Sequence, residues 1–456
     1  MVTHRLGGRF VTPLIMAAVV GLGLLFLVAF RPAGKMNVIL VTVDTLRADH
    51  LGVYGYARNT SPNVDRFAKE SILFRHAFSH ANTTNPSFSS LMTSHYPHET
   101  KVLNNFYLLP PGAVTMAEIL KANGYHTAAI NSHFSLRRGS GFEQGFDEYD
   151  DHLEDLVLRR KERIAPNTTL AAVKWLERNY KKEFFLWVHY DDPHGPYAPP
   201  PPYNTMFVEP PPRDNTTLRA ERFNAKIPGY QKLGNHRDPK YYISQYDGEI
   251  RFFDQAFGDL INKVQELGLF DSSILVFTSD HGESMGERDY YFTHGEVLYN
   301  EQIHVPLVIR FPGQSPEVKE VRYPVSHVDV LPTILDTISV RYAHALKGQN
   351  LLTRREDRLV FSETHRQGSK YTSIVNNMKF IEGDTYELYD IEKDFSENEN
   401  LMKGRRALDF FSPKADPLKT RLDAIRQQDA LRLGAPIFWS IESPMRKELR
   451  GLGYVQ

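Results

Sequence analysis

Short apolar runs alternate with amphipathic stretches along most of this chain. Residues 37–43 form a β-rich apolar run that predicts a strand buried on both faces. Similar runs recur at 127–130, 184–189, 274–278 and 305–310. The stretches between them repeat their apolar positions at helical spacing, at 64–69, 115–122, 170–178 and 250–267. This alternation predicts an α/β domain with a mostly parallel sheet flanked by helices.

One apolar stretch near the N-terminus is longer than any of these runs. Residues 11–30 are interrupted only by Thr12 and Pro13, and a helix of that length spans about 30 Å, the thickness of a bilayer core. We therefore predict a short flank at residues 1–10 and a single-pass transmembrane anchor at residues 11–30. A cleaved signal peptide is the alternative, but no small-x-small cleavage site follows the run.

The pattern changes again after residue 340. Residues 36–340 carry the alternating strands and helices and form the predicted main domain. Residues 341–456 predict a smaller C-terminal α+β subdomain that ends in a helical tail. Its short antiparallel strands are expected near 359–363, 371–375, 379–382 and 387–389.

Two proline clusters lie within residues 193–212. Proline cannot donate to a sheet ladder and breaks helices, so this segment is neither core strand nor helix. A stiff linker would explain the composition, but the strand and helix pattern resumes after it. We expect a long surface loop that shapes the rim of a pocket.

Composition narrows the chemistry that the chain can carry. Charged residues make up 24% and the formal net charge is −1, so no global field favours nucleic acid as a partner. The chain has no cysteine, which excludes disulfides, thiolate metal sites and a cysteine nucleophile. Its 18 histidines leave imidazole and carboxylate groups as potential ligands for a metal ion.

Polar groups follow three of the predicted strands directly. Asp44 ends the first strand, Asp280 and His281 end another, and His194 lies in a proline-rich turn beyond a third. Because the carboxyl ends of parallel strands meet at one edge of a sheet, we expect these groups to lie together. Carboxylates and an imidazole there could bind one divalent ion. The alternatives are that Asp280 caps the next segment and that His194 is an ordinary surface histidine.

The segment 82–93 places a hydroxyl at a predicted helix start. Pro86 suits the first helical position, and Asn85 or Thr84 suits the cap. A hydroxyl there faces unpaired backbone N–H groups and the positive end of the helix dipole, which favours an anion. Capping alone would explain such a segment, but we predict that Thr84 is a nucleophile.

These pieces occur in an order that resembles the sulfatase family of the alkaline phosphatase superfamily. The motifs that carry the resemblance stand at 41–49, 86–87, 91–93, 96–98, 192–194, 279–283, 305–309, 387–390 and 449–455. The resemblance covers nearly everything after Met36. It implies an α/β fold and a catalytic domain that works outside the cytoplasm, on a membrane anchor in this chain.

The resemblance also implies roles for individual residues. Asp44, Asp280 and His281 would hold one divalent metal ion, which could be Ca²⁺, Mg²⁺, Mn²⁺ or Zn²⁺. Thr84 would occupy the nucleophile position and be a further metal ligand.

Two histidines complete the residues that the resemblance implies. His194 would be a substrate or leaving-group histidine. His294 falls where many members have a lysine, and would be a second cationic or acid group.

The sequence departs from the usual sulfatase pattern at three positions. Sulfatases usually have a second acid where this chain has Thr45, and an arginine where it has Phe88. They carry a cysteine or serine that is oxidised to formylglycine where this chain has Thr84, and threonine cannot form that aldehyde. We therefore expect no formylglycine. Asp44, Thr84, Asp280 and His281 together resemble the site of threonine-nucleophile relatives in the superfamily, such as lipoteichoic acid synthases and phosphoethanolamine transferases.

The predicted function is hydrolysis or transfer of an anionic ester group. A divalent ion offset by Asp44, Asp280 and a Thr84 alkoxide leaves the centre near net negative, which favours a monoanionic phosphodiester or sulfate ester over a dianionic phosphomonoester. We place the phosphodiester first, on a small molecule, a lipid head group or a glycan. The alternatives are a true sulfuric ester hydrolase and a catalytically silent, membrane-anchored binding protein.

Overall fold

The computed structural model describes residues 36–155, 161–209, 226–313, 319–353, 358–403, 414–427, 433 and 435–439. The flank 1–10 and the predicted anchor 11–30 therefore lie outside the described residues. Among those that are described, we find no helix with the length and apolarity needed to cross a membrane. From residue 37 onwards, the described residues form one compact unit.

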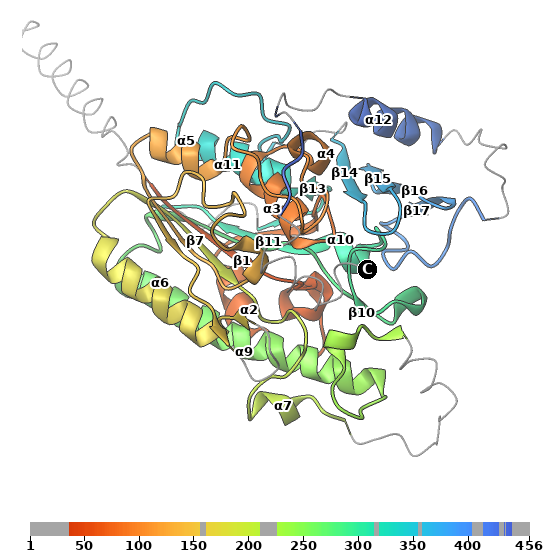
Figure 1. The fold of residues 1–456 in the computed structure, drawn as a ribbon, viewed down its shortest axis with the longest axis horizontal. Coiled ribbons are helices and arrows are strands. Elements are labelled where there is room, and N and C mark those ends of the chain that lie inside the picture. The colour runs from red at the N-terminus through yellow and green to blue at the C-terminus, as the bar shows by residue number, and fades with distance from the viewer. Residues whose placement is uncertain are drawn as a thin grey trace, which may run out of the picture. The chain divides into compact units, whose positions relative to one another are not determined.

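In the described part of the chain, nine strands form one mixed, mostly parallel sheet (Figure 1). Eight of them lie side by side in the order β12 (Glu320–Val321), β2 (Ile72–Phe78), β11 (His304–Arg310), β8 (Ser273–Ser279), β1 (Asn37–Val43), β7 (Phe184–Tyr190), β3 (His126–Ile130) and β4 (Glu148–Asp150). The ninth, β13 (Val325–Ser326), pairs with β2. Strand β1 is parallel to both of its neighbours, β7 and β8, so its carboxyl end lies beside theirs.

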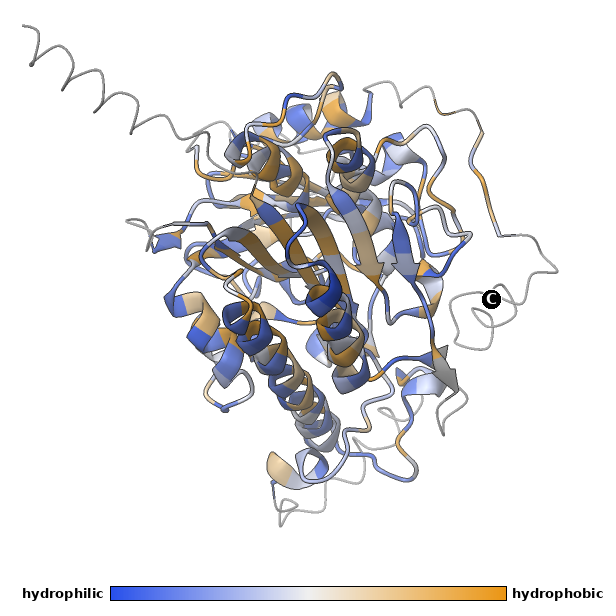
Figure 2. Cartoon of the chain, turned by 90° about the vertical axis from the view of Figure 1, so that its left-hand side faces the viewer, coloured by the Kyte–Doolittle hydropathy of each residue, from blue (hydrophilic) through white to orange (hydrophobic). Residues whose placement is uncertain are grey.

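Helices cover both faces of this sheet (Figure 1). One face packs against α2 (Pro62–Lys69), α6 (Ala165–Asn179) and α9 (Pro239–Glu266). The other packs against α3 (Thr84–Thr93), α5 (Met116–Ala122) and α11 (Val330–Thr337). Successive strand side chains point to opposite faces, so Ile39 and Val41 enter the first core while Val38 and Leu40 enter the second. Figure 2 shows the hydrophobic residues gathered on these central strands.

The predicted α/β fold class is confirmed, but the sheet differs from the prediction in strand direction and in strand number. Strand β11 is antiparallel to both β8 and β2, so the sheet is not purely parallel. The short strands β4, β12 and β13 have no counterpart among the predicted strands, and neither has the longer strand β2. Its apolar run is interrupted by Arg75 and His76, which are only partly buried in this strand.

The C-terminal part contains a separate four-stranded antiparallel sheet, as predicted. Its strands are β14 (Val360–Thr364), β15 (Lys370–Val375), β16 (Met378–Glu382) and β17 (Tyr386–Asp390). Helix α12 (Asp416–Arg426) packs against this sheet through Leu418 and Leu422. The predicted helical tail is confirmed only over α12. Phe438 instead forms an isolated β-bridge with Tyr107, and residues 440–456 lie outside the described part.

The remaining elements are short. They are α4 (Pro97–Thr100), α7 (Tyr203–Met206), α10 (Asn300–Ile303), β5 (Glu154–Asp155), β6 (Lys161–Glu162), β9 (Ser284–Met285), β10 (Tyr291–Thr293) and single 3-10 turns at Ala48–His50, Gly52–Tyr54, Phe134–Leu136, Gly229–Gln231, Glu287–Asp289 and His327–Asp329. The proline-rich segment is confirmed as irregular apart from the single turn α7, as far as residue 209.

Candidate active site

The carboxyl ends of β1 and β8 bring three predicted ligands together. Asp44 follows β1, and Asp280 and His281 follow β8. One ligand atom from each of the three lies within 4.8 Å of the others, and all three side chains are fully buried. The shared edge of the sheet therefore forms the acidic and imidazole group that the sequence predicts.

The hydrogen bonds around Asp280 and His281 leave one atom of each available to a cation. Asp280 Oδ1 accepts the backbone N–H groups of Thr45 and His281, at 3.1 and 2.8 Å. Asp280 Oδ2 lies 3.5 Å from His281 Nε2. Among the described residues, neither of these two atoms nor either carboxylate oxygen of Asp44 has a hydrogen-bond partner. Buried polar atoms of this kind fit a bound divalent ion.

The orientation of the His281 ring follows from Gly282. The ring Nδ1 lies 2.9 Å from the Gly282 carbonyl oxygen, to which it donates, so Nε2 carries the lone pair that a metal ion needs. A Cβ at Gly282 would come within 2.2 Å of the Glu301 carbonyl oxygen. Glycine is therefore required beside this ligand by the close approach of Glu301.

Burial controls the protonation of these groups in the protein without an ion. Burial, with the neighbouring charge of Asp280, raises the pKa of Asp44 to about 6, and burial raises the pKa of Asp280 to about 8. Burial lowers the pKa of His281 to about 4, so its imidazole is neutral near pH 7. A divalent cation among them would favour the ionised carboxylates and thus reverse the shift of the acids.

Thr84 is the first residue of α3, and its side chain is fully buried. Its Oγ1 accepts a long hydrogen bond of 3.5 Å from Asn105 Nδ2. One turn later, Ser87 Oγ donates to the Asp280 carbonyl oxygen at 2.6 Å. This bond ties the start of α3 to the carboxyl end of β8.

The predicted helix cap is wrong by one residue. The cap is Thr83, whose backbone is extended, and not Thr84 or Asn85. Pro86 consequently lies in the first turn instead of at the first helical position. A proline is tolerated there because the N–H groups of a first turn have no partner within the helix.

His194 and His294 lie beside the acidic group. The ring centroid of His294 is 4.6 Å from that of His281 and 5.4 Å from that of His194. His294 Nδ1 is 2.9 Å from Glu283 Oε1, and Glu283 Oε2 accepts the Tyr197 hydroxyl at 2.7 Å. The structure therefore brings together all of the histidines that the sequence predicts for the site.

Three residues near Asp44 are absent from the sequence-predicted set. His189 Nε2 lies 3.7 Å from Asp44 Oδ2, and His133 Nε2 lies 3.8 Å from the same atom. Asp191 Oδ1 lies 3.9 Å from His133 Nε2. Each of these residues is at or just beyond the carboxyl end of β3 or β7, at the same edge of the sheet as Asp44 and Asp280.

Phe88, in place of the arginine that is usual in the family, belongs to the core. Its side chain is fully buried, and its ring centroid lies 5.2 Å from that of Trp187 and 4.9 Å from that of His189. The position therefore supports the ring of His189 and brings no positive charge to the site.

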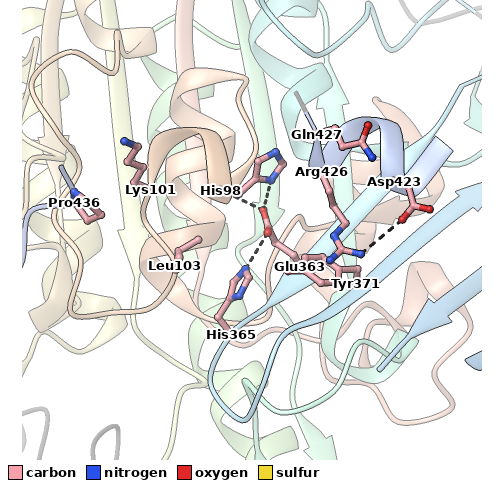
Figure 3. A pocket seen from close by; sticks show the side chains of 10 residues that line it. All are labelled: His98, Lys101, Leu103, Glu363, His365, Tyr371, Asp423, Arg426, Gln427 and Pro436. Carbon is pink, nitrogen blue, oxygen red and sulfur yellow. Dashed lines mark hydrogen bonds and ion pairs between the residues drawn. The ribbon is translucent and has the colours of Figure 1, made fainter. Parts of the chain in front are cut away.

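A cavity of about 480 Å³ lies between α4, the C-terminal sheet and α12 (Figure 3). Its lining is mainly polar and charged: His98, Lys101, Leu103, Glu363, His365, Tyr371, Asp423, Arg426, Gln427 and Pro436. Glu363 lies between His98 and His365, at 2.8 and 2.9 Å. The residue after His365 is Arg366, which donates to the His294 carbonyl oxygen at 2.6 Å. One short segment therefore borders both this cavity and the histidine group.

Comparison with known proteins agrees with this arrangement. The family profile described as "Sulfatase" matches residues 36–340, and the profile described as "N-sulphoglucosamine sulphohydrolase, C-terminal" matches residues 286–428. The structure resembles the crystal structure of the phosphonate monoester hydrolase of Agrobacterium radiobacter, with a TM-score of 0.69 and 19% identity, over 89% of this chain and all of that one.

Two curated relatives are similar in sequence. The Ulvan-active sulfatase of Formosa agariphila is 28% identical over 344 residues, which cover 70% of this chain and 64% of that protein. The uncharacterised sulfatase YidJ of Escherichia coli is 26% identical over 469 residues, which cover 91% of this chain and 92% of that protein.

The fold and the buried acid and histidine group define an esterase of the alkaline phosphatase superfamily. Within that superfamily, the chain belongs to the sulfatase family, whose profile spans the whole α/β domain. Enzymes of this class use a divalent metal ion, and the buried atoms of Asp44, Asp280 and His281 fit one.

Proposed function

We propose that this protein is a metal-dependent hydrolase or transferase of a monoanionic ester, with Thr84 as its nucleophile and a phosphodiester as its preferred substrate. One observation carries the proposal. The Thr84 hydroxyl is buried in the first turn of α3, and that turn is tied through Ser87 to Asp280. A hydroxyl so placed needs no oxidation to act as a nucleophile.

The reaction proceeds by two displacements. Thr84 Oγ attacks phosphorus, the bond from phosphorus to the first alcohol oxygen breaks, and a covalent phosphothreonine ester forms. The leaving alcohol takes a proton from His194 or His294, which face one another at the site. The proton that Thr84 loses in this step passes to water. In the second step, water or an acceptor alcohol gives its proton to the histidine and displaces Thr84 Oγ, which takes a proton back from water. The choice between water and alcohol separates hydrolysis from transfer.

The helix start alone is too weak to activate Thr84. A helix N-terminus stabilises an anion by about 0.3–1 kcal/mol. A divalent ion held by Asp44, Asp280, His281 and Thr84 would supply the greater effect, since such ions lower the pKa of bound water from about 15.7 towards about 7. The protein itself holds the Thr84 hydroxyl, the two carboxylates and the imidazole together in one buried site.

A true sulfatase is the second candidate function. The family profile and the name of the Formosa relative favour a sulfate ester, whereas the name of the Agrobacterium structure favours a phosphonate ester. We rank the phosphodiester above the sulfate ester because Thr84 cannot become formylglycine. A sulfated Thr84 would therefore have to be hydrolysed by a water molecule.

The group on the alcohol side of the ester has room in the cavity shown in Figure 3. Its charged lining and the ring of Tyr371 suit a hydroxylated group, such as a glycan or a lipid head group. The segment with His365 and Arg366 connects this cavity to the histidines. A small aryl ester would leave the cavity empty.

We also propose that residues 11–30 anchor the protein in a membrane, with the catalytic domain outside the cytoplasm. The length and apolarity of this segment support the proposal. Treatment of intact spheroplasts with an added protease tests this proposal. We expect the protease to digest the catalytic domain while the membrane is intact. Protection of the domain until the cells are lysed would contradict the proposal.

The proposed activity is tested with a panel of aryl phosphodiester, sulfate, phosphonate and phosphomonoester substrates, each with added Mn²⁺, Mg²⁺, Ca²⁺ or Zn²⁺. We expect the highest kcat/KM with the phosphodiester. Preference for the sulfate would establish the second candidate instead. A chain that turns over no ester and is not stabilised by any of the four ions would be the silent binding protein.

A further inference from the structure

A second group of potential ligands lies beside the first and shares Asp44 with it. One ligand atom from each of Asp44, His133 and Asp191 lies within 4.8 Å of the others. All three side chains are buried, with 0%, 0% and 2% of each residue exposed. They come from the carboxyl ends of three neighbouring strands, β1, β3 and β7.

The distances in this group are those between ligands of one ion. Hydrogen bonds from N–H to oxygen are about 2.7–3.2 Å long, so 3.8 Å from His133 Nε2 to Asp44 and 3.9 Å to Asp191 are too long. Two ligands of a tetrahedral ion, each about 2.1 Å from it, lie about 3.4 Å apart. The observed separations exceed that value by only a few tenths of an ångström.

The buried carboxylate of Asp44 needs a cation or a hydrogen-bond donor at each of its two oxygens. Both of its carboxylate oxygens are fully buried, and neither has a hydrogen-bond partner among the described residues. His189 Nε2 is in the same condition and lies 3.7 Å from Asp44 Oδ2. Leaving such atoms unsatisfied is costly, and a carboxylate that bridges two ions satisfies both of its oxygens.

Hydrogen bonding orients the His133 ring towards this group. Asn85 Nδ2 donates to two backbone carbonyl oxygens, so its Oδ1 accepts the Ser135 hydroxyl at 2.9 Å. The Ser135 hydroxyl lies 2.8 Å from His133 Nδ1, and the Ser135 backbone N–H donates to the same atom at 3.4 Å. These contacts fix the ring so that Nε2 faces Asp44 and Asp191, at 3.8 and 3.9 Å.

We propose that Asp44, His133 and Asp191 hold a second divalent cation, with His189 as a fourth donor, so that Asp44 bridges two ions. The donors are carboxylate oxygens and imidazole nitrogens in a dry site, which suits Zn²⁺ or Mn²⁺ better than Ca²⁺. The inference deepens the proposed function, since it shares Asp44 with that centre. A second ion adds two positive charges where an anionic ester would bind.

Metal content is the first test. The metal-free chain is saturated with Zn²⁺ or Mn²⁺ alone, and the ions that remain after desalting are counted. We expect two ions per chain in the wild type and one in each of His133→Gln and His281→Gln. His126→Gln is the matched control, because His126 also lies beside two carboxylates, Asp147 and Glu148, but at the surface. This control should keep two ions.

A spectroscopic measurement on the wild type keeps the proposal testable if a variant fails to fold. Two Mn²⁺ ions that share Asp44 should give the electron paramagnetic resonance spectrum of an exchange-coupled pair, and His133→Gln should give that of a single ion. One ion per wild-type chain with an uncoupled spectrum would overturn the inference. Ester turnover by that one-ion protein would leave the proposed function standing.

Discussion

Thr83 and Thr84 offer a matched pair for testing the nucleophile. Both are buried threonines. The Thr83 side chain makes no capping hydrogen bond, whereas the Thr84 hydroxyl accepts a hydrogen bond from the Asn105 side chain. We predict that Thr84→Ala lowers kcat by roughly a thousandfold or more, because no other hydroxyl takes its place in the covalent step. Thr83→Ala should lower kcat by less than roughly tenfold.

The measurement is steady-state turnover of the best ester from the panel, with metal content determined for both variants. Equal losses in the two variants would show that the packing of the helix start, and not the Thr84 hydroxyl, carries the effect. Loss of the bound ion in Thr84→Ala alone would be consistent with its predicted role as a ligand.

At the scale of single residues, the sequence predicted the part of the site that follows directly from strand ends. Asp44, Asp280 and His281 were predictable because each comes immediately after an apolar run. His133 and Asp191 were not found, although they lie at the same edge of the sheet. His133 follows β3 after two intervening residues, and Asp191 lies beside Asp192, so local sequence gave no reason to prefer either.

Among the secondary-structure elements, β16 carries a buried ion pair that joins the C-terminal sheet to α10. Lys379 Nζ lies 2.6 Å from Glu397 Oε1, and both side chains are fully buried. Both also bond to Asn300, the first residue of α10. We predict that Lys379→Ala lowers the free energy of unfolding by about 3–5 kcal/mol, because it leaves the charge of Glu397 buried without a counter-ion.

Lys393→Ala is the control for this prediction. Lys393 pairs with Asp390 at 2.9 Å, but the side chain of Lys393 is 81% exposed. Such exposed pairs contribute little to stability, because water and salt screen them. Urea unfolding of the two variants provides the comparison, and equal stability losses would contradict the role assigned to the buried pair.

The elements themselves were largely predictable, but the direction and pairing of strands were not. The apolar runs located β1, β3, β7, β8 and β11 to within one or two residues at each end. Strand β11 runs antiparallel to β8, and a hydrophobic pattern does not encode the direction in which a strand joins a sheet. Strand β2 was missed because Arg75 and His76 are polar, yet the strand is held by β11 on one side.

For the molecule as a whole, metal ions should stabilise the fold more strongly as the pH rises. Without an ion, burial raises the pKa of Asp44 to about 6 and of Asp280 to about 8. The folded chain therefore binds more protons than the unfolded chain between the ordinary carboxyl pKa of 3.8 and those values. Raising the pH through this range therefore destabilises the ion-free fold. An ion must displace these protons, so its apparent binding strengthens by about 1.4 kcal/mol per pH unit for each proton released.

Thermal unfolding with and without Mn²⁺ at pH 6 and pH 8.5 tests this relation. The increase in Tm caused by the ion should be larger at pH 8.5. An increase that is equal or larger at pH 6 would contradict the burial argument. Asp280→Asn should abolish the pH dependence that belongs to Asp280, whichever ion is used.

The stereochemical course at phosphorus tests the central claim most directly. The substrate is a phosphodiester made chiral at phosphorus by one sulfur substituent and by oxygen isotopes. The metal-loaded enzyme turns it over, and the configuration at phosphorus in the product is determined. Attack by Thr84 followed by displacement by water is two in-line steps, each with inversion, so the account predicts net retention. Net inversion would mean that water attacks directly, and would remove Thr84 as the nucleophile.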